Sequence, residues 1–190
     1  MGRAKIGFAS LLLLCGSHSF ADYEDGVNAA FSGDYDTAFR EFTLAAESGL
    51  HLAQYNLGIL YFFGQGVDKD LEQSFRWTQA AAEQGHVAAQ HNLGSLYYEG
   101  QGVDRDRATA VEWYSTAAKA GHADAALLLA EMFQQGVSVR RDPVQAHAWA
   151  SMAVNNEHVE ASSLRESIEN RMNQEQLNQA RRLFAQWQIE

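Results

Sequence analysis

Cysteine and proline are nearly absent from this chain of 190 residues, which holds one of each, Cys15 and Pro143. A single cysteine excludes a framework of internal disulfides. Strand-type runs of valine and isoleucine are also missing, whereas alanine is abundant, and this balance favours helices over strands. Because apolar residues still make up 46% of the chain, the sequence predicts a packed core and not wholesale disorder.

Basic residues are scarce as well. The 14 Lys and Arg residues stand against 24 Asp and Glu, which gives a net charge of −10 at pH 7. A charge of this sign repels nucleic acid and anionic lipid headgroups, so we expect neither as a partner. Solubility is the ordinary consequence of such an acidic surplus, and a basic partner protein is the more specific alternative.

The N-terminal residues show the three parts of a secretory signal. Arg3 and Lys5 are the only charges before Asp22. An apolar run covers residues 6–15, and residues 19–21 place small side chains at the two positions that a signal peptidase reads. The apolar run is too short to span a bilayer, which takes about 20 apolar residues, and no later run reaches that length. We therefore predict that a signal peptide of residues 1–21 is removed, and that the protein is exported to the periplasm or secreted, with no membrane insertion in its mature form.

Cys15 offers an alternative, a lipid anchor that would tether the protein as an envelope assembly or structural component. Bacterial lipidation signals place a small residue directly before the cysteine, whereas Leu14 is bulky. We therefore expect Cys15 to leave with the signal peptide. Because that segment holds Arg3 and Lys5 and no acid, the mature chain would keep 12 basic and 24 acidic residues and no cysteine.

A shift of 36 residues superposes much of the chain on itself, which is the signature of a repeat protein. Tryptophan, aspartate, histidine, alanine and glycine all recur at this one shift, and so many coincidences are not expected by chance. The matched sets are Trp77, Trp113 and Trp149; Asp70, Asp106 and Asp142; His86, His122 and His158; Ala53, Ala89 and Ala125; and Gly64, Gly100 and Gly136.

Each repeat has the pattern of two helices. Apolar residues at helical spacing predict a first helix over residues 53–63, with the small Gly58 allowing close approach of a partner helix. The glycine-rich residues 64–66 end that helix, because glycine accepts a positive φ without strain. A second helix is predicted over residues 71–83, and Gly85 ends it.

Asp70, Asp106 and Asp142 stand where an N-cap belongs, since a short carboxylate accepts the free amide hydrogens of a first helical turn. Pro143 follows Asp142 directly, at the first helical position, where its missing N–H has no cost. The only proline of the chain thus supports the predicted repeat boundaries.

Residues 53–70 and 89–106 both match the pattern Ala-x-x-x-Leu-Gly-x-x-Tyr-x-x-Gly-x-Gly-Val-x-x-Asp. Residues 77–86 and 113–122 both match Trp-x-x-x-Ala-Ala-x-x-Gly-His. These motifs resemble the Sel1-like repeat family, relatives of the tetratricopeptide repeats. The resemblance implies an all-α, right-handed α/α solenoid whose members bind other proteins and are often exported bacterial proteins.

The two ends of the array differ from its middle, as a solenoid requires, because each interior repeat exposes apolar faces to both neighbours. The third copy also departs from the motif, with Ala130 in place of glycine and Ser138 in place of the second loop glycine. The predicted organisation is a signal peptide (1–21), a tetratricopeptide-like unit (22–52), two Sel1-like repeats (53–88 and 89–124), a degenerate repeat (125–160) and a two-helix C-terminal cap (161–190).

No cofactor or metal site is predicted. Equivalent residues of stacked repeats lie about 10 Å apart, whereas zinc needs its ligands about 2 Å from one ion. His86, His122 and His158 are therefore interpreted as turn residues at helix starts. Asp68 and Asp70 lack the further oxygen ligands of a calcium loop, so helix capping is the preferred interpretation.

Catalytic motifs are missing from the sequence: it contains no Gly-x-Ser-x-Gly, no His-Glu-x-x-His and no Ser-x-x-Lys. Some cysteine-rich members of the resembled family have been linked to β-lactam binding or hydrolysis, but those are stapled by disulfides. We therefore predict a binding scaffold or regulator and not an enzyme, with a β-lactam-binding or hydrolysing enzyme as the alternative.

The first helices of such a solenoid line its concave face, where partners bind. Phe62, Phe63 and Tyr98 are predicted to anchor an apolar side chain of a bound protein or peptide, and the alternative is that they pack on the next repeat. The recurring tryptophans are expected in the core. The predicted partner-binding positions are Tyr55, Ile59, Phe62, Phe63, His91, Ser95, Tyr98, Glu99, Leu127, Glu131, Gln134 and Gln135.

Overall fold

The structure is a computed structural model that describes residues 9–189, with side chains described from Phe20 onward. The predicted signal peptide begins outside the described residues. The Cys15 side chain, on which the lipid-anchor alternative depends, lies outside them as well.

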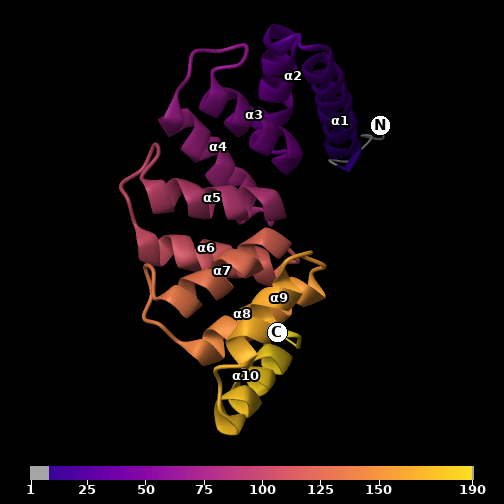
Figure 1. Cartoon of the computed structure of the whole chain (residues 1–190). Coiled ribbons are helices and arrows are strands. Elements are labelled where there is room, and N and C mark those ends of the chain that lie inside the picture. The colour runs from indigo at the N-terminus through magenta and orange to yellow at the C-terminus, as the bar shows by residue number, and fades with distance from the viewer. Residues whose placement is uncertain (1–8, 190) are drawn as a thin grey trace, which may run out of the picture. The chain divides into compact units, whose positions relative to one another are not determined.

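The described residues form ten helices and no strand, which confirms the all-α fold class (Figure 1). None of these helices combines the length and the apolar character that a membrane span requires. They are α1 (Ala9–Ser32), α2 (Tyr35–Glu47), α3 (His51–Phe63), α4 (Leu71–Glu83), α5 (Val87–Glu99), α6 (Arg107–Lys119), α7 (Ala123–Gln135), α8 (Pro143–Asn155), α9 (Ala161–Glu169) and α10 (Gln174–Trp187).

The chain divides into two compact units, an N-terminal unit that ends at His86 and a C-terminal unit that starts at Val87. In the N-terminal unit each helix packs on the next, α1 on α2, α2 on α3 and α3 on α4. Alanines allow this close packing, and Phe42, Leu57 and Leu60 are the large buried side chains of its core. Trp77 lies half-buried against them.

In the C-terminal unit α5 packs on α6, α6 on α7 and α7 on α8, and both α9 and α10 cover α8 (Figure 1). Trp149 of α8 is only 4% exposed and stacks on Trp187 of α10 with 4.0 Å between ring centroids. Burial of one such side chain stabilises a fold by about 1.5–3 kcal/mol. The contact between these two rings therefore stabilises the packing of α10 on α8. Trp113 of α6, the equivalent of Trp149 one repeat earlier, is only half-buried.

The second helix of every repeat starts at an aspartate N-cap, as the sequence predicts. Asp70 Oδ1 accepts hydrogen bonds from the backbone N–H groups of Glu72 and Gln73, both at 3.0 Å. Asp106 and Asp142 cap α6 and α8 in the same way. Each such cap is worth about 1 kcal/mol.

Glycine at the centre of the first helix lets the second helix approach closely. A Cβ placed on Gly58 would lie 2.7 Å from Thr78 Oγ1, and one on Gly94 would lie 2.8 Å from the Tyr114 ring. Contacts this short do not occur, so a methyl group at either position would push the paired helices apart.

The third repeat replaces this glycine with Ala130, and the structure provides a reason. The residue of α8 at the position of Tyr114 is Ala150, so the large side chain opposite the glycine is also gone. Both alanines are fully buried in the core of the C-terminal unit. In the third repeat the small residue has thus become larger and the residue opposite it has become smaller. The two changes together preserve the close packing of the helix pair.

Two other departures in the third repeat leave backbone strain. Ser138 and Glu157 both adopt a left-handed conformation, with φ of 65°. The matching residues one repeat earlier are Gly102 (φ 72°) and Gly121 (φ 100°). A residue with a Cβ loses about 1–2 kcal/mol in this conformation relative to the right-handed one, whereas glycine does not. The Ser138 hydroxyl is in addition buried and without a hydrogen-bond partner in the described part of the chain.

Replacing Ser138 or Glu157 with glycine should therefore raise the free energy of unfolding by about 1 kcal/mol each, because glycine removes the strain. Urea denaturation measures the change. Gly121→Ala is the matched control and should lose a similar amount. If neither glycine variant gains stability, the left-handed conformations assigned to these two residues are wrong.

Candidate functional site

Two surface pockets lie between consecutive first helices, one in each unit. The first pocket, in the N-terminal unit, has a volume of about 290 Å³ and is lined by residues of α1, α2 and α3. Its apolar lining includes Phe31 near the end of α1, Phe42 of α2 and Ile59 of α3. Phe31 is 89% exposed, so a large aromatic side chain stands at the rim in contact with solvent.

The second pocket, in the C-terminal unit, has a volume of about 280 Å³ and lies between α5 and α7, with Tyr114 of α6 in its lining. Tyr98 and Glu99 come from the end of α5, and Glu131 comes from α7. Apolar side chains complete the wall, and they are Leu128, Met132 and Val137.

The two pockets occupy the same place in the repeat. Phe42 and Tyr114 are two repeat lengths apart and lie at equivalent positions, and so do Ile59 and Glu131. Each aromatic residue is also the one that meets the central glycine of its helix pair, Gly26 or Gly94. The packing that brings two helices together thus also places an aromatic ring in each pocket.

The chemistry of the two pockets differs. Alignment of Gly26 with Gly94 puts Phe31 of the first pocket at the position of Glu99 in the second. Glu99 is exposed and Glu131 is half-buried, and neither carboxylate forms a salt bridge or hydrogen bond within the described residues. The first pocket is therefore apolar at its rim, and the second is acidic.

The Tyr114 hydroxyl donates a hydrogen bond to Ser95 Oγ at 3.1 Å. Burial raises the pKa of the Tyr114 phenol, the bond to Ser95 partly offsets this, and nearby Tyr98 and Glu99 raise the pKa further. The phenol is therefore neutral at physiological pH and presents an uncharged ring beside the two carboxylates.

Five of the predicted partner-binding residues line these pockets. Ile59 lies in the first pocket, and Tyr98, Glu99, Glu131 and Gln135 lie in the second. Sequence reasoning missed Phe31, although an alignment on the central glycines would have placed it beside Glu99.

Tyr55 and His91, equivalent residues of α3 and α5, pack on histidines. Tyr55 stacks on His86 with ring centroids 4.4 Å apart, and His91 stacks on His122 at the same distance. Burial lowers the pKa of both His86 and His122, and a second histidine beside each lowers it further. His122 Nδ1 also accepts a hydrogen bond from Ala125 N at 3.3 Å, and so caps α7.

Phe62 and Phe63 contact each other edge to face, with 5.0 Å between ring centroids. The Lys69 ammonium lies 5.5 Å from the Phe62 ring, at a distance typical of a cation–π contact. Phe63 is 64% exposed. The remaining predicted residues are half-buried, and they are Ser95, Leu127 and Gln134.

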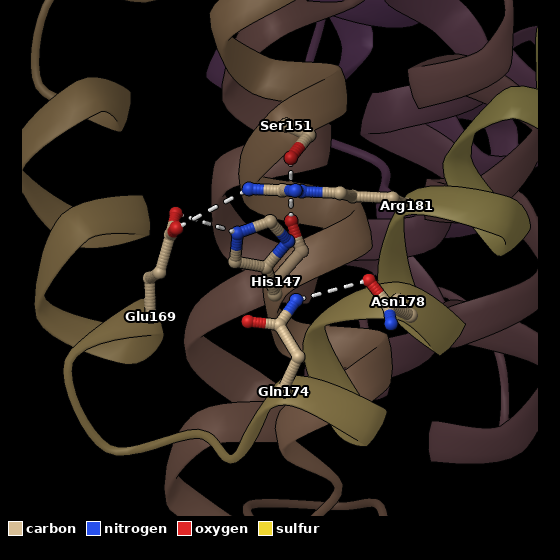
Figure 2. Close-up of polar contacts among 6 residues, drawn as sticks. All are labelled: His147, Ser151, Glu169, Gln174, Asn178 and Arg181. Carbon is tan, nitrogen blue, oxygen red and sulfur yellow. Dashed lines mark hydrogen bonds and ion pairs between the residues drawn. The ribbon is translucent and has the colours of Figure 1, made fainter.

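A third group of chemistry-bearing side chains joins α8 to α9 and α10 (Figure 2). Nε2 of the buried His147 lies 3.3 Å from Glu169 Oε2. The Arg181 guanidinium lies 3.5 Å from the other carboxylate oxygen of Glu169. Burial lowers the pKa of His147, although Glu169 acts in the opposite direction. Ser151 Oγ donates to the backbone carbonyl of His147 at 2.9 Å and not to its ring.

This arrangement lacks the hydroxyl-to-imidazole bond that an activated serine requires. It instead joins α9 to α8 through Glu169 and His147, and α10 to α9 through Arg181 and Glu169 (Figure 2). Among the side chains that the structure describes, from Phe20 onward, no three His, Cys, Asp or Glu residues are grouped as metal ligands would be.

Stacked helix pairs of 36 residues, each with a capped second helix, define an α-helical repeat protein of the solenoid class. The family model described as Sel1 repeat matches residues 51–86, 87–122 and 123–158, more than half of the chain. The chain therefore belongs to the Sel1 repeat family. No curated protein matches the sequence.

Solved structures support the same assignment. A Sel1 repeat protein from Oxalobacter formigenes is 29% identical with a TM-score of 0.68, over 73% of this chain and 57% of that one. A protective antigen of uropathogenic Escherichia coli strains, which displays an SLR fold, is 29% identical with a TM-score of 0.50, over 89% of this chain and 45% of that one. The chain thus spans about half the length of these two proteins.

Proposed function

We propose that this protein is an interaction module that binds exposed side chains of a partner protein or peptide in the pockets between its first helices. The Sel1 repeat fold generally mediates protein–protein interaction, and its scaffolds are typically non-enzymatic. The observation that carries the proposal is the recurrence of one pocket at equivalent positions in both units.

The exposed Phe31 supports this proposal because a side chain that is 89% exposed contributes little to the fold. Large apolar groups left in solvent beside a pocket are typical of binding sites, where aromatic residues contribute a large share of the binding energy. The pocket is apolar and open at the point where Phe31 and Ile59 meet solvent.

Peptides selected from a random dodecapeptide phage library against purified protein provide a defined ligand. Phe31→Ala should weaken binding of a peptide seated in the first pocket by roughly tenfold or more, because loss of an aromatic anchor costs over 1 kcal/mol. Fluorescence anisotropy with the labelled peptide measures the dissociation constant.

Leu44→Ala is the matched control, since Leu44 is 50% exposed on the second helix α2 and does not line the pocket. It should leave the affinity unchanged, and circular dichroism melting should be the same for both variants. The proposal for the first pocket would be contradicted if the Phe31→Ala and Ile59→Ser variants both bound the selected peptides as tightly as the Leu44→Ala control.

We also propose that the protein is exported with a mature start near Asp22. In support, two residues of α1 beyond the predicted cleavage point pack on α2: the Tyr23 ring lies 5.8 Å from the Phe42 ring, and Gly26 packs on the same ring. Cleavage after Ala21 would keep both of these contacts between α1 and α2.

Mass spectrometry of the protein isolated from its native cells should give an N-terminus within a few residues of Asp22. A mass that corresponds to a diacylated or triacylated N-terminal Cys15 would replace this proposal with the lipid-anchored alternative. A chain that keeps residues 1–21 in the cytoplasm would contradict both.

A further inference from the structure

We propose that the second pocket binds a cationic side chain, lysine or arginine, of the partner. This inference rests on the proposed function and adds the chemistry of the ligand. The pocket brings together two carboxylates from different helices, Glu99 of α5 and Glu131 of α7, and two phenol rings, Tyr98 and Tyr114.

The two carboxylates are available for a partner. Neither Glu99 nor Glu131 has a salt bridge or hydrogen bond within the described part of the chain. Both carboxylates line the same pocket, so a guanidinium or ammonium group seated in it can form charge-assisted hydrogen bonds with them. Because Glu131 is half-buried, water screens its charge less than that of a fully exposed residue.

The rings of the pocket suit a cation as well. Arg107 of α6 lies over the Tyr98 ring with its guanidinium carbon 5.2 Å from the ring centroid. This contact shows that Tyr98 accepts a cation on one face, and it places one basic residue, Arg107, beside the pocket lining. The two negative charges of Glu99 and Glu131 exceed the single positive charge of Arg107, so these three residues together still attract an incoming cation.

The apolar part of the wall matches the stem of the same side chains. Leu128, Met132 and Val137 line the pocket beside the carboxylates. Lysine and arginine bury their methylene groups on apolar surface while the charged head reaches a polar partner. The net charge of −10 also draws basic segments toward the protein.

The first pocket provides an internal comparison. At the positions of Glu99 and Glu131 it has Phe31 and Ile59, so the same backbone site is apolar there. The repeat thus presents one scaffold with two side-chain chemistries, which is how specificity for one residue type over another arises.

Two labelled peptides, (Ala-Ser-Arg)4 and (Ala-Ser-Leu)4, test the inference in fluorescence anisotropy. At about 150 mM salt the Debye length is about 8 Å, so attraction between distant surface charges is largely screened. The arginine peptide should bind, and the variant Glu99→Gln/Glu131→Gln should weaken it by roughly tenfold or more. Glu99→Asp/Glu131→Asp should keep most of the affinity because both charges remain.

Glu112→Gln/Glu166→Gln is the matched charge control, since it also removes two acids, both of which are exposed and lie outside the pocket lining. It should change the affinity by less than twofold. Equal losses in this control and in the pocket variant would mean diffuse surface attraction, and would overturn the inference. Absence of arginine-peptide binding, or binding that the pocket variant keeps, would overturn it as well.

The leucine peptide separates this inference from the proposed function. If it binds and loses affinity in Phe31→Ala, the proposed function stands even where the arginine peptide fails. If (Ala-Ser-Leu)4 binding, the phage selection and the arginine peptide all fail, the proposed function itself is wrong.

Discussion

The two helices of each pair approach so closely that the side chains at their crossing must be complementary in size. Gly26 faces Phe42, Gly58 faces Thr78, and Gly94 faces Tyr114. Interiors pack at the density of organic crystals, so a single added methyl group at these glycines has no space. The motif glycine is therefore one half of a pair, and the residue of the second helix opposite it decides whether glycine is required.

The candidate site depends on the same constraint. The rings of Phe42 and Tyr114 pack against the central glycines, and the same rings form part of the lining of the two pockets. A scaffold of nearly identical helix pairs thus offers an aromatic surface at equivalent places, and the outward residues of the first helices vary around it. Phe31 and Ile59 make one pocket apolar, and Glu99 and Glu131 make the other acidic.

The local sequence pattern, together with composition and the family resemblance, predicted the all-α class, the helix that runs to Phe63, the second helix over 71–83 and the aspartate caps, because each depends on residues close in sequence. It did not predict which outward side chains line a pocket. Tyr55 and His91 lie at positions predicted to face outward, yet they stack on His86 and His122, which lie in the turns after α4 and α6. That choice depends on how neighbouring helices are positioned in three dimensions, which a shift of the sequence along itself does not encode.

The most direct test of the size pairing is a double-mutant cycle on Gly94 and Tyr114, with unfolding free energies from urea denaturation. Gly94→Ala alone should destabilise the protein by about 1–3 kcal/mol, because the methyl group overlaps the Tyr114 ring. In a Tyr114→Ala background the same change should cost little, as the natural pair Ala130 and Ala150 indicates, so a coupling of about 1 kcal/mol or more is expected. Equal losses in both backgrounds would contradict the account.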